Sequence, residues 1–246
     1  MKPGRYYPHV TVIVVCLCFA AWLDHEAVAR RKVPILLDEG EPAIYTVATQ
    51  LDAFALYKTL GLHGAAVVHC SPYLNLVEYF PPEEERTAPF PIRTADIRPA
   101  YEKGLNAHTW LFIANRIGLV RTATVVLPDD VFRERLGEFR ANMFFSAEGV
   151  GMSGHARDMP FKVFQLGDLP SIAEPVVVNV DAGFFRSGMD PAALADRLRL
   201  KLPDLRVLVL IGSTNESAVT SAMREDLLKF AAAYQTIDAT GGKGRP

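Results

Sequence analysis

Cysteine is scarce in this chain of 246 residues, and its scarcity excludes several kinds of site. Of three cysteines, Cys16 and Cys18 lie in an apolar N-terminal run, which leaves Cys70 as the one thiol of the remaining chain. A single thiol supports neither an intrachain disulfide nor a cysteine-rich zinc site. Cys70 also has no visible activating neighbour, so thiol catalysis has no support in the sequence.

The motifs of several other classes are absent as well. No Gly-x-Ser-x-Gly elbow occurs, which leaves serine nucleophile catalysis unsupported. Val47 runs into Ala-Thr-Gln rather than a glycine-rich phosphate loop, which argues against a dinucleotide site. The 26 basic and 28 acidic side chains give a net charge of −2, without the basic face that nucleic acids require. We therefore expect no nucleic-acid partner.

The first 29 residues have the pattern of a secretory signal. Lys2 and Arg5 precede the apolar run 10–23, and Ala27 to Ala29 (AVA) suits signal peptidase. At about 1.5 Å per residue the run reaches about 21 Å, short of the roughly 30 Å hydrocarbon core of a membrane. We predict a signal peptide over 1–29 and an exported protein, periplasmic or extracellular. An uncleaved anchor is the alternative, in which case this segment alone contacts the membrane.

Beyond residue 29, apolar runs of strand length alternate with segments of helical period. Strands are expected over 43–47, 65–68, 122–127, 161–166, 175–180 and 206–211. Helices are expected over 51–60, 101–117, 191–200 and 216–234, and 146–159 is interpreted as a loop that either covers a site or is merely mobile. Continuous apolar strands between helices are typical of a parallel sheet covered on both faces. We expect 30–246 to form one α/β domain, a three-layer α/β/α sandwich with a mainly parallel sheet.

Ligands of such sheets bind beyond the carboxyl ends of the strands, so the residues after each strand are the first candidates. His69 to Asn75 (HCSPYLN) follow the second expected strand, and the stretch Asn179 to Phe185 (NVDAGFF) ends the fifth. Here the chain resembles the arginase and deacetylase fold, in particular an uncharacterised bacterial branch related to peptide arginases. That branch places Asp-x-His-x-Asp after an early strand and Asp-x-Asp before paired phenylalanines after a late one. The segment 106–128 also resembles a part of this family, and so does the strand 208–213 with the helix from Ser217, so the resemblance implies an arginase-like fold.

The family holds one or two divalent ions, usually manganese or zinc, which polarise a water for attack on a guanidinium or amide carbon. Carried over by position, the ligands fall on Ser71, Tyr73 and Asn75 in the early stretch, on Asn179 and Asp181 in the late one, and near Gln50 upstream. Only Asp181 keeps an ionisable carboxylate, and neutral oxygens hold a dication poorly. The resemblance therefore implies a decayed metal centre, and we expect no resident cofactor.

Asp181 is the strongest candidate, as a catalytic group or metal ligand, because a carboxylate at the end of an apolar strand is costly to bury unpaired. His69 is either a general base oriented by Asp181 or a core histidine. The candidate substrate-binding residues are Ser71, Tyr73, Asn75, His155, Asn179 and Ser213. Structural alternatives exist for them: Tyr73 and Asn75 suit a turn, His155 a mobile loop, and Ser213 a helix cap.

Two functional hypotheses follow. In the first, the protein is an exported, arginase-like pseudoenzyme that binds a small molecule or peptide, or serves as a scaffold. In the second, it is a metal-dependent hydrolase of C–N bonds in guanidino or amide substrates, with manganese or zinc in a rearranged centre around Asp181 and His69. Three or more metal-competent side chains within about 4 Å of a common point would favour the hydrolase.

Overall fold

A computed structural model describes residues 42–77, 101–141, 145–148, 151–156 and 159–236. The chain divides into two compact units, Met1–Pro34 and Ile35–Pro246, and every described residue belongs to the second. The expected signal segment 1–29 lies outside the described residues. Among those residues, no helix combines the length and the apolar character needed to cross a membrane.

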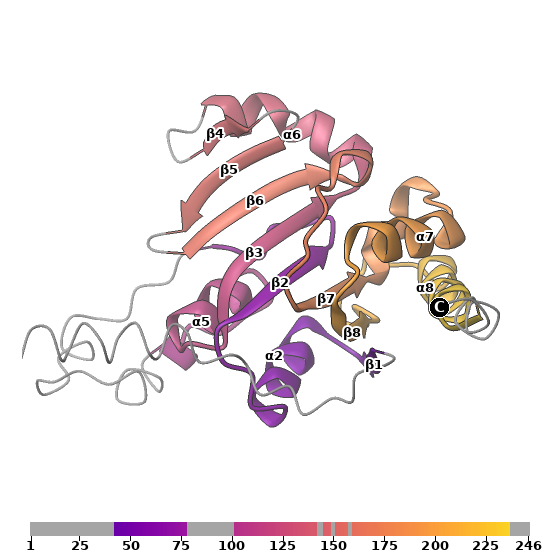
Figure 1. The fold of residues 1–246 in the computed structure, drawn as a ribbon, viewed down its shortest axis with the longest axis horizontal. Helices are drawn as coiled ribbons and strands as arrows, with labels where there is room; N and C mark the ends of the chain where they lie inside the picture. The colour runs from indigo at the N-terminus through magenta and orange to yellow at the C-terminus, as the bar shows by residue number, and fades with distance from the viewer. Residues whose placement is uncertain (1–41, 78–100, 142–144, 149–150, 157–158, 237–246) are drawn as a thin grey trace, which may run out of the picture. The chain divides into compact units, whose positions relative to one another are not determined.

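In the described part of the chain, eight strands form one sheet of order β1-β8-β7-β2-β3-β6-β5-β4 (Figure 1). They are β1 (Ala43–Val47), β2 (Ala65–Cys70), β3 (Val120–Leu127), β4 (Phe145–Glu148), β5 (Gly151–Ala156), β6 (Met159–Gln165), β7 (Val176–Asp181) and β8 (Leu205–Ile211). All pairs from β1 across to β6 are parallel, and β5 and β4 join as antiparallel neighbours. The prediction of an α/β fold with a mainly parallel sheet is confirmed.

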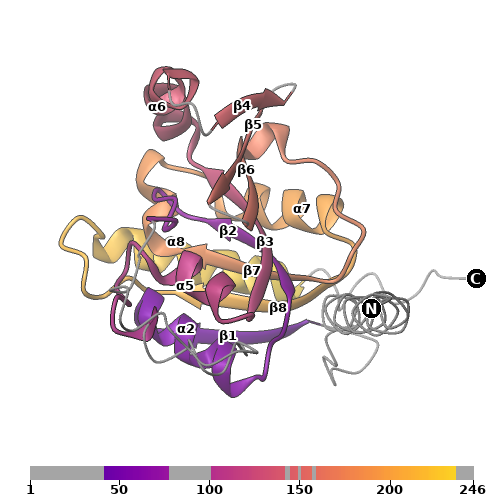
Figure 2. The same ribbon diagram turned by 90° about the vertical axis from the view of Figure 1, so that its left-hand side faces the viewer.

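Helices cover both faces of the sheet (Figures 1 and 2). The α-helices are α2 (Gln50–Thr59), α5 (Trp110–Arg116), α6 (Asp129–Ala141), α7 (Pro191–Lys201) and α8 (Ser221–Thr236), and the 3-10 helices are η1 (Leu166–Asp168) and η2 (Ala182–Ser187). The α7 and α8 helices lie on one face of β7 and β8, and α2 and α5 lie on the other (Figure 1). The expected three-layer α/β/α arrangement is therefore present.

Alternation along the strands separates an apolar face from a partly polar one. On the α7/α8 face, Val68, Val178 and Leu208 join a core completed by Leu198 and Phe230. Successive strand residues point to opposite faces, so their neighbours in sequence lie toward α2 and α5. His69 and Asn179 are two of these neighbours, and both are fully buried. The polar residues of β2 and β7, which are His69, Asn179 and Asp181, thus lie on one side of the sheet.

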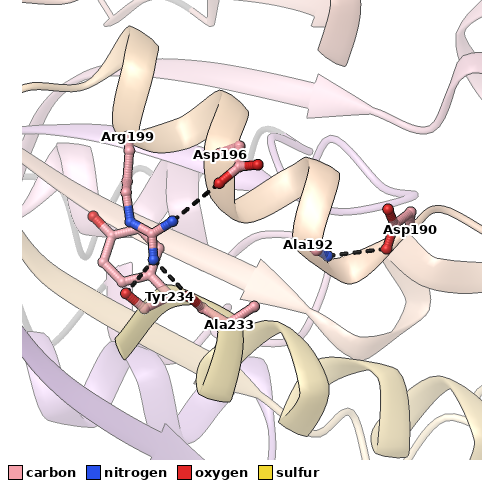
Figure 3. A network of polar contacts seen from close by, with 6 residues as sticks. All are labelled: Asp190, Ala192, Asp196, Arg199, Ala233 and Tyr234. Carbon is pink, nitrogen blue, oxygen red and sulfur yellow. Dashed lines mark hydrogen bonds and ion pairs between the residues drawn. The ribbon is translucent and has the colours of Figure 1, made fainter. Parts of the chain in front are cut away.

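One guanidinium group, that of Arg199, adds a polar contact between α7 and α8 to their apolar packing (Figure 3). Nη2 of Arg199 donates to the carbonyl oxygens of Ala233, at 2.7 Å, and Tyr234, while the guanidinium lies 4.6 Å from the Tyr234 ring centroid. Carbonyls of a last helical turn have no intrahelical partner, so this contact satisfies two of them. Asp190 caps α7 by accepting from the backbone N–H of Ala192 at 3.1 Å.

The predicted helix over 101–117 is too long. The α5 helix begins at Trp110, because local side-chain hydrogen bonds hold the preceding segment in turns. Thr109 Oγ1 donates to the carbonyl oxygen of Gly104 at 2.7 Å, and the side chain of Asn106 accepts from the backbone N–H of His108 at 2.8 Å. Asn and Thr compete with helices in this way through hydrogen bonds to nearby backbone.

The interpretation of 146–159 as a loop is also wrong where the chain is described. This stretch contributes most of β4 and all of β5, which pair in antiparallel register from Phe145 opposite Gly154 to Glu148 opposite Gly151.

The last helix begins at Ser221 rather than 216, because 212–216 form a turn in which the N–H of Glu216 donates to the carbonyl of Ser213.

Replacing Asp190 with Ala is expected to lower the free energy of unfolding by about 1 kcal/mol, because the first turn of α7 loses its cap. Urea unfolding followed by circular dichroism measures the change. Asp196→Ala is the matched control, since Asp196 is 66% exposed and loses only a surface ion pair with Arg199. Equal effects of the two substitutions would contradict the role given to the cap.

Candidate functional site

The winding direction of the sheet changes between β2 and β7. From β2 the chain continues to β3 on one side, whereas from β7 it continues to β8 on the other. The carboxyl ends of neighbouring strands at such a point bound the crevice where open α/β sheets bind ligands. Asp181 ends β7 and Ser71 directly follows β2, so both lie at this point.

The carboxylate of Asp181 is fully buried and accepts three hydrogen bonds. Its Oδ1 accepts from the backbone N–H of Gly183 at 2.7 Å, and its Oδ2 accepts from Ser213 Oγ and Gln50 Nε2, each at 2.7 Å. Burial raises the pKa of Asp181 to about 6, and the nearby charge of Glu216 adds to the rise, whereas the three hydrogen bonds act in the opposite direction.

The side-chain amide of Gln50 lies among three oxygen atoms. Nε2 donates to Asp181 Oδ2 at 2.7 Å, to Glu216 Oε1 at 2.7 Å and to Ser213 Oγ at 3.1 Å. An amide nitrogen has only two hydrogens for these acceptors. Gln50, Asp181, Ser213 and Glu216 are together called the rim cluster here. Two of its oxygens, Gln50 Oε1 and Glu216 Oε2, are buried with no hydrogen-bond partner in the described part of the chain.

Backbone contacts bring the ends of β1 and β8 together at the rim cluster. The N–H groups of Gly212 and Thr214 donate to the carbonyls of Val47 and Ala48, at 2.9 and 3.0 Å. Thr49 caps α2 through a reciprocal capping box with Asp52, which places Gln50 at the first helical position. The segment after the last strand is therefore fixed beside the start of the first helix.

Two residues of the site have unusual backbone conformations. Among the described residues other than glycine, only Asn75 and Ser213 have positive φ, at 56° and 45°. Asparagine tolerates this region, but for serine it carries strain. Arg224 holds the strained turn by donating to the carbonyls of Gly212 and Ser213, at 3.0 and 3.4 Å. Strain that surrounding contacts maintain is frequent at functional sites.

Gly183 allows η2 to approach the segment after β2. A Cβ atom at this position would lie 3.1 Å from both Pro72 Cγ and Asp181 Oδ1, closer than side chains normally pack. Glycine therefore permits the backbone N–H of residue 183 to reach Asp181 while η2 stays against Pro72.

A second set of hydrogen bonds, formed by uncharged groups, lies in and just after β2. His69 Nε2 lies 3.1 Å from Asn75 Oδ1, and Asn75 Nδ2 donates to the carbonyl of Ala107. Burial lowers the pKa of His69 to about 4, although the bond with Asn75 acts in the opposite direction. Ser71 Oγ accepts from the backbone N–H of Tyr73 at 3.2 Å, so this hydroxyl supports the turn.

The structure brings some of the predicted site residues together and separates others. Asp181 and Ser213 are hydrogen-bonded to each other, and Tyr73 is close enough to Asp181 and Glu216 to interact with their charges. His69 bonds to Asn75 rather than Asp181, and no described contact joins His69 to Asp181. His155 lies in β5, opposite Pro160 in β6, and β3 and β6 separate it from β2.

Gln50 and Glu216 are the functional candidates that the sequence analysis did not select. Both follow a parallel strand closely, β1 in one case and β8 in the other, which is the signal that could have identified them. The sequence pattern predicts that Glu216 begins a helix, and it marks Gln50 only as the counterpart of a family ligand. Asn179 lies two residues before Asp181 and accepts from the Tyr57 hydroxyl at 3.0 Å.

The described residues do not fit the divalent metal centre that the family resemblance implies. Among them, no group of three or more His, Cys, Asp or Glu side chains could hold a metal ion. The two carboxylates that do approach each other, Asp181 and Glu216, both accept from the same amide nitrogen of Gln50. The amide N–H group of Gln50 therefore lies between the two carboxylates, where a metal ion coordinated by both of them would have to bind.

Comparison with known proteins gives no family assignment. No family model matches the chain, and neither curated protein sequences nor solved structures give a match. The arginase-like affinity therefore stays a prediction from the sequence.

Asp181 and His69 are expected to make opposite contributions to the pH dependence of stability. Asp181 has a pKa of about 6 in the folded protein against 3.8 ordinarily, so the folded state binds its proton more tightly and stability falls as pH rises through this window. His69 has a pKa of about 4 against 6.5, so the unfolded chain binds its proton more tightly and stability rises with pH. In the wild type the two trends largely cancel.

Single substitutions should expose each trend. When the pH is raised from about 4.5 to 7, the free energy of unfolding of Asp181→Asn is expected to rise by about 2–3 kcal/mol relative to that of the wild type. That of His69→Gln is expected to fall by a similar amount relative to the wild type. Urea unfolding at both pH values measures these differences. Glu174→Gln is the control, because Glu174 is exposed and lies just before β7, at the opposite end from Asp181. A wild-type pH profile in Asp181→Asn would contradict the prediction.

Proposed function

We propose that this protein is an exported, arginase-like pseudoenzyme whose rim cluster binds a small molecule carrying a guanidinium or primary ammonium group. The observation that carries the proposal is the environment of Gln50 Nε2. This nitrogen is within hydrogen-bond distance of two carboxylates and a hydroxyl. The cluster thus surrounds an N–H donor with oxygen acceptors, and it carries negative charge that the neutral amide does not compensate.

The acceptors of the rim cluster exceed its donors. Gln50 Oε1 and Glu216 Oε2 have no partner within the described residues, and neither Asp181 nor Glu216 forms an ion pair there. A guanidinium group offers five N–H donors and an ammonium group three, each with a positive charge. Hydrogen bonds from such groups to carboxylates are stronger than those from a neutral amide. A cationic N–H donor is therefore the ligand chemistry that the cluster favours.

Tyr73 supplies an aromatic group at the exposed border of this region. Its side chain is half-buried and lies edge-on to the ring of His108, with centroids 6.2 Å apart. Burial raises the pKa of Tyr73, the charges of Glu216 and Asp181 add to the rise, and the charge of Arg186 opposes it, so the phenol is close to both carboxylates and to one guanidinium. An aromatic ring beside an acidic cluster favours an organic cation, because ring faces attract cations.

The alternative, a metal-dependent C–N hydrolase centred on Asp181 and His69, has less support from these contacts. A divalent ion requires several anionic or imidazole ligands around one point. His69 bonds to Asn75, and Asp181 already accepts three hydrogen bonds. The binding hypothesis needs no rearrangement of the metal-competent residues.

Isothermal titration calorimetry with butylguanidine, butylamine and the neutral isostere butylurea tests the proposed ligand class. The wild type is expected to bind at least one of the two cations and to bind butylurea at least about tenfold more weakly. Asp181→Asn and Glu216→Gln should each weaken binding of the cation at least about tenfold, because each removes a negative acceptor. Glu174→Gln should bind as the wild type does.

Three results would count against this function. They are equal affinity for butylurea and butylguanidine, an equal loss in Glu174→Gln, and the absence of binding by either cation. Titration of the dialysed protein with manganese or zinc alone addresses the hydrolase. A stoichiometric site that Asp181→Asn abolishes would replace the binding hypothesis with the metal-dependent one.

A further inference from the structure

Four fully buried side chains form a closed group between the sheet and helices α2 and α5. They are Tyr57, His69, Trp110 and Asn179, called the buried quartet here. The Tyr57 hydroxyl donates to Asn179 Oδ1 at 3.0 Å, and the Trp110 ring lies edge-on to Tyr57 and to His69, with centroids 5.8 and 5.5 Å apart. His69 and Asn179 are partners in the β2–β7 register. Each member therefore contacts or directly neighbours two others.

Three polar atoms of the buried quartet have no hydrogen-bond partner within the described chain. They are His69 Nδ1, Trp110 Nε1 and Asn179 Nδ2. Buried polar groups in native proteins are almost always paired, with protein or with ordered water, because leaving one unpaired is costly. Three such atoms, on His69 and on two side chains that each adjoin it, point to a shared partner rather than three separate defects.

The hydrogen bonds of Asn75 determine the role of His69 Nδ1. Asn75 Nδ2 donates to the carbonyl of Ala107, so the amide oxygen of Asn75 faces His69. Because Asn75 Oδ1 can only accept a hydrogen bond, the Nε2 atom of His69 must carry the ring hydrogen that donates to it. Because burial lowers the pKa of His69 to about 4, the ring is neutral near pH 7 and Nδ1 is a bare acceptor. The quartet thus presents two N–H donors and one acceptor.

We infer that the buried quartet encloses a binding site for a single ordered water molecule. The water accepts from Trp110 Nε1–H and Asn179 Nδ2–H and donates to His69 Nδ1, which gives it the roughly three hydrogen bonds usual for internal water. The donor set selects the ligand. Two N–H groups disfavour a cation such as ammonium, the lone pair on Nδ1 disfavours an anion, and a neutral molecule that both accepts and donates satisfies all three.

This water has a positioning role behind the rim cluster. Tyr57 lies in the helix that begins with Gln50, and Asn179 lies two residues before Asp181 on the same face of β7. A water bridge among β2, β7 and α5, continued to α2 by the Tyr57–Asn179 bond, links the elements that place Gln50 and Asp181. The inference does not depend on the proposed ligand class.

Nuclear magnetic resonance on the ¹⁵N-labelled protein tests the water site directly. The indole N–H of Trp110, assigned with Trp110→Phe, is expected to show a nuclear Overhauser cross-peak to a water that tumbles with the protein. Long-range ¹H–¹⁵N spectra should show His69 neutral, with hydrogen on Nε2. An absent cross-peak, or hydrogen on Nδ1, would overturn the inference.

Two variants separate the site from general packing. Asn179→Leu keeps a similar volume without the amide donor and should abolish the cross-peak. Val178→Ala alters the neighbouring residue on the opposite face of β7 and should preserve it. Persistence of the cross-peak in Asn179→Leu would overturn the assignment to the buried quartet. If Asn179→Leu does not fold, the wild-type cross-peak and the His69 tautomer decide the question.

Discussion

The burial of one carboxylate, that of Asp181, is the constraint around which this end of the molecule is organised. Its pKa of about 6 against an ordinary 3.8 corresponds to a cost of about 3 kcal/mol for keeping it ionised at neutral pH. Donors from α2, from η2 and from the turn after β8 reduce that cost. Their requirement for exact placement explains both the close approach at Gly183 and the strained φ of Ser213.

The rim cluster and the buried quartet contribute different kinds of polar groups, charged and neutral, to one face of the sheet. The fully buried Asp181 and the partly buried Glu216 bring negative charge to the carboxyl ends of the strands, whereas the quartet, two residues deeper along β7, is neutral near pH 7. The charged groups therefore lie at the strand ends, and the groups that need only hydrogen bonds lie deeper on the same face of the sheet. His69 belongs to the neutral region, as the core-histidine interpretation anticipates.

Much of the parallel sheet could be predicted because its strands are continuous apolar runs, of which 175–180 is the clearest. The antiparallel pair β4 and β5 could not, since GMSGHA has Gly154 where alternation with Met152 and Ala156 would need an apolar side chain, and its pairing depends on β6. Asp181 could be selected because it ends an apolar strand. Glu216 could not, because its role depends on a turn that brings β8 beside the start of α2.

The reversal of direction beyond β6 also affects how the sheet meets other chains. At that edge the described sheet finishes in β4, a strand of four residues, and at the other edge in β1, a strand of five. Long parallel edges would offer a template for pairing between molecules, and short edge strands limit it. The short β4–β5 hairpin therefore covers the edge of β6 and limits pairing with other chains at that side of the sheet.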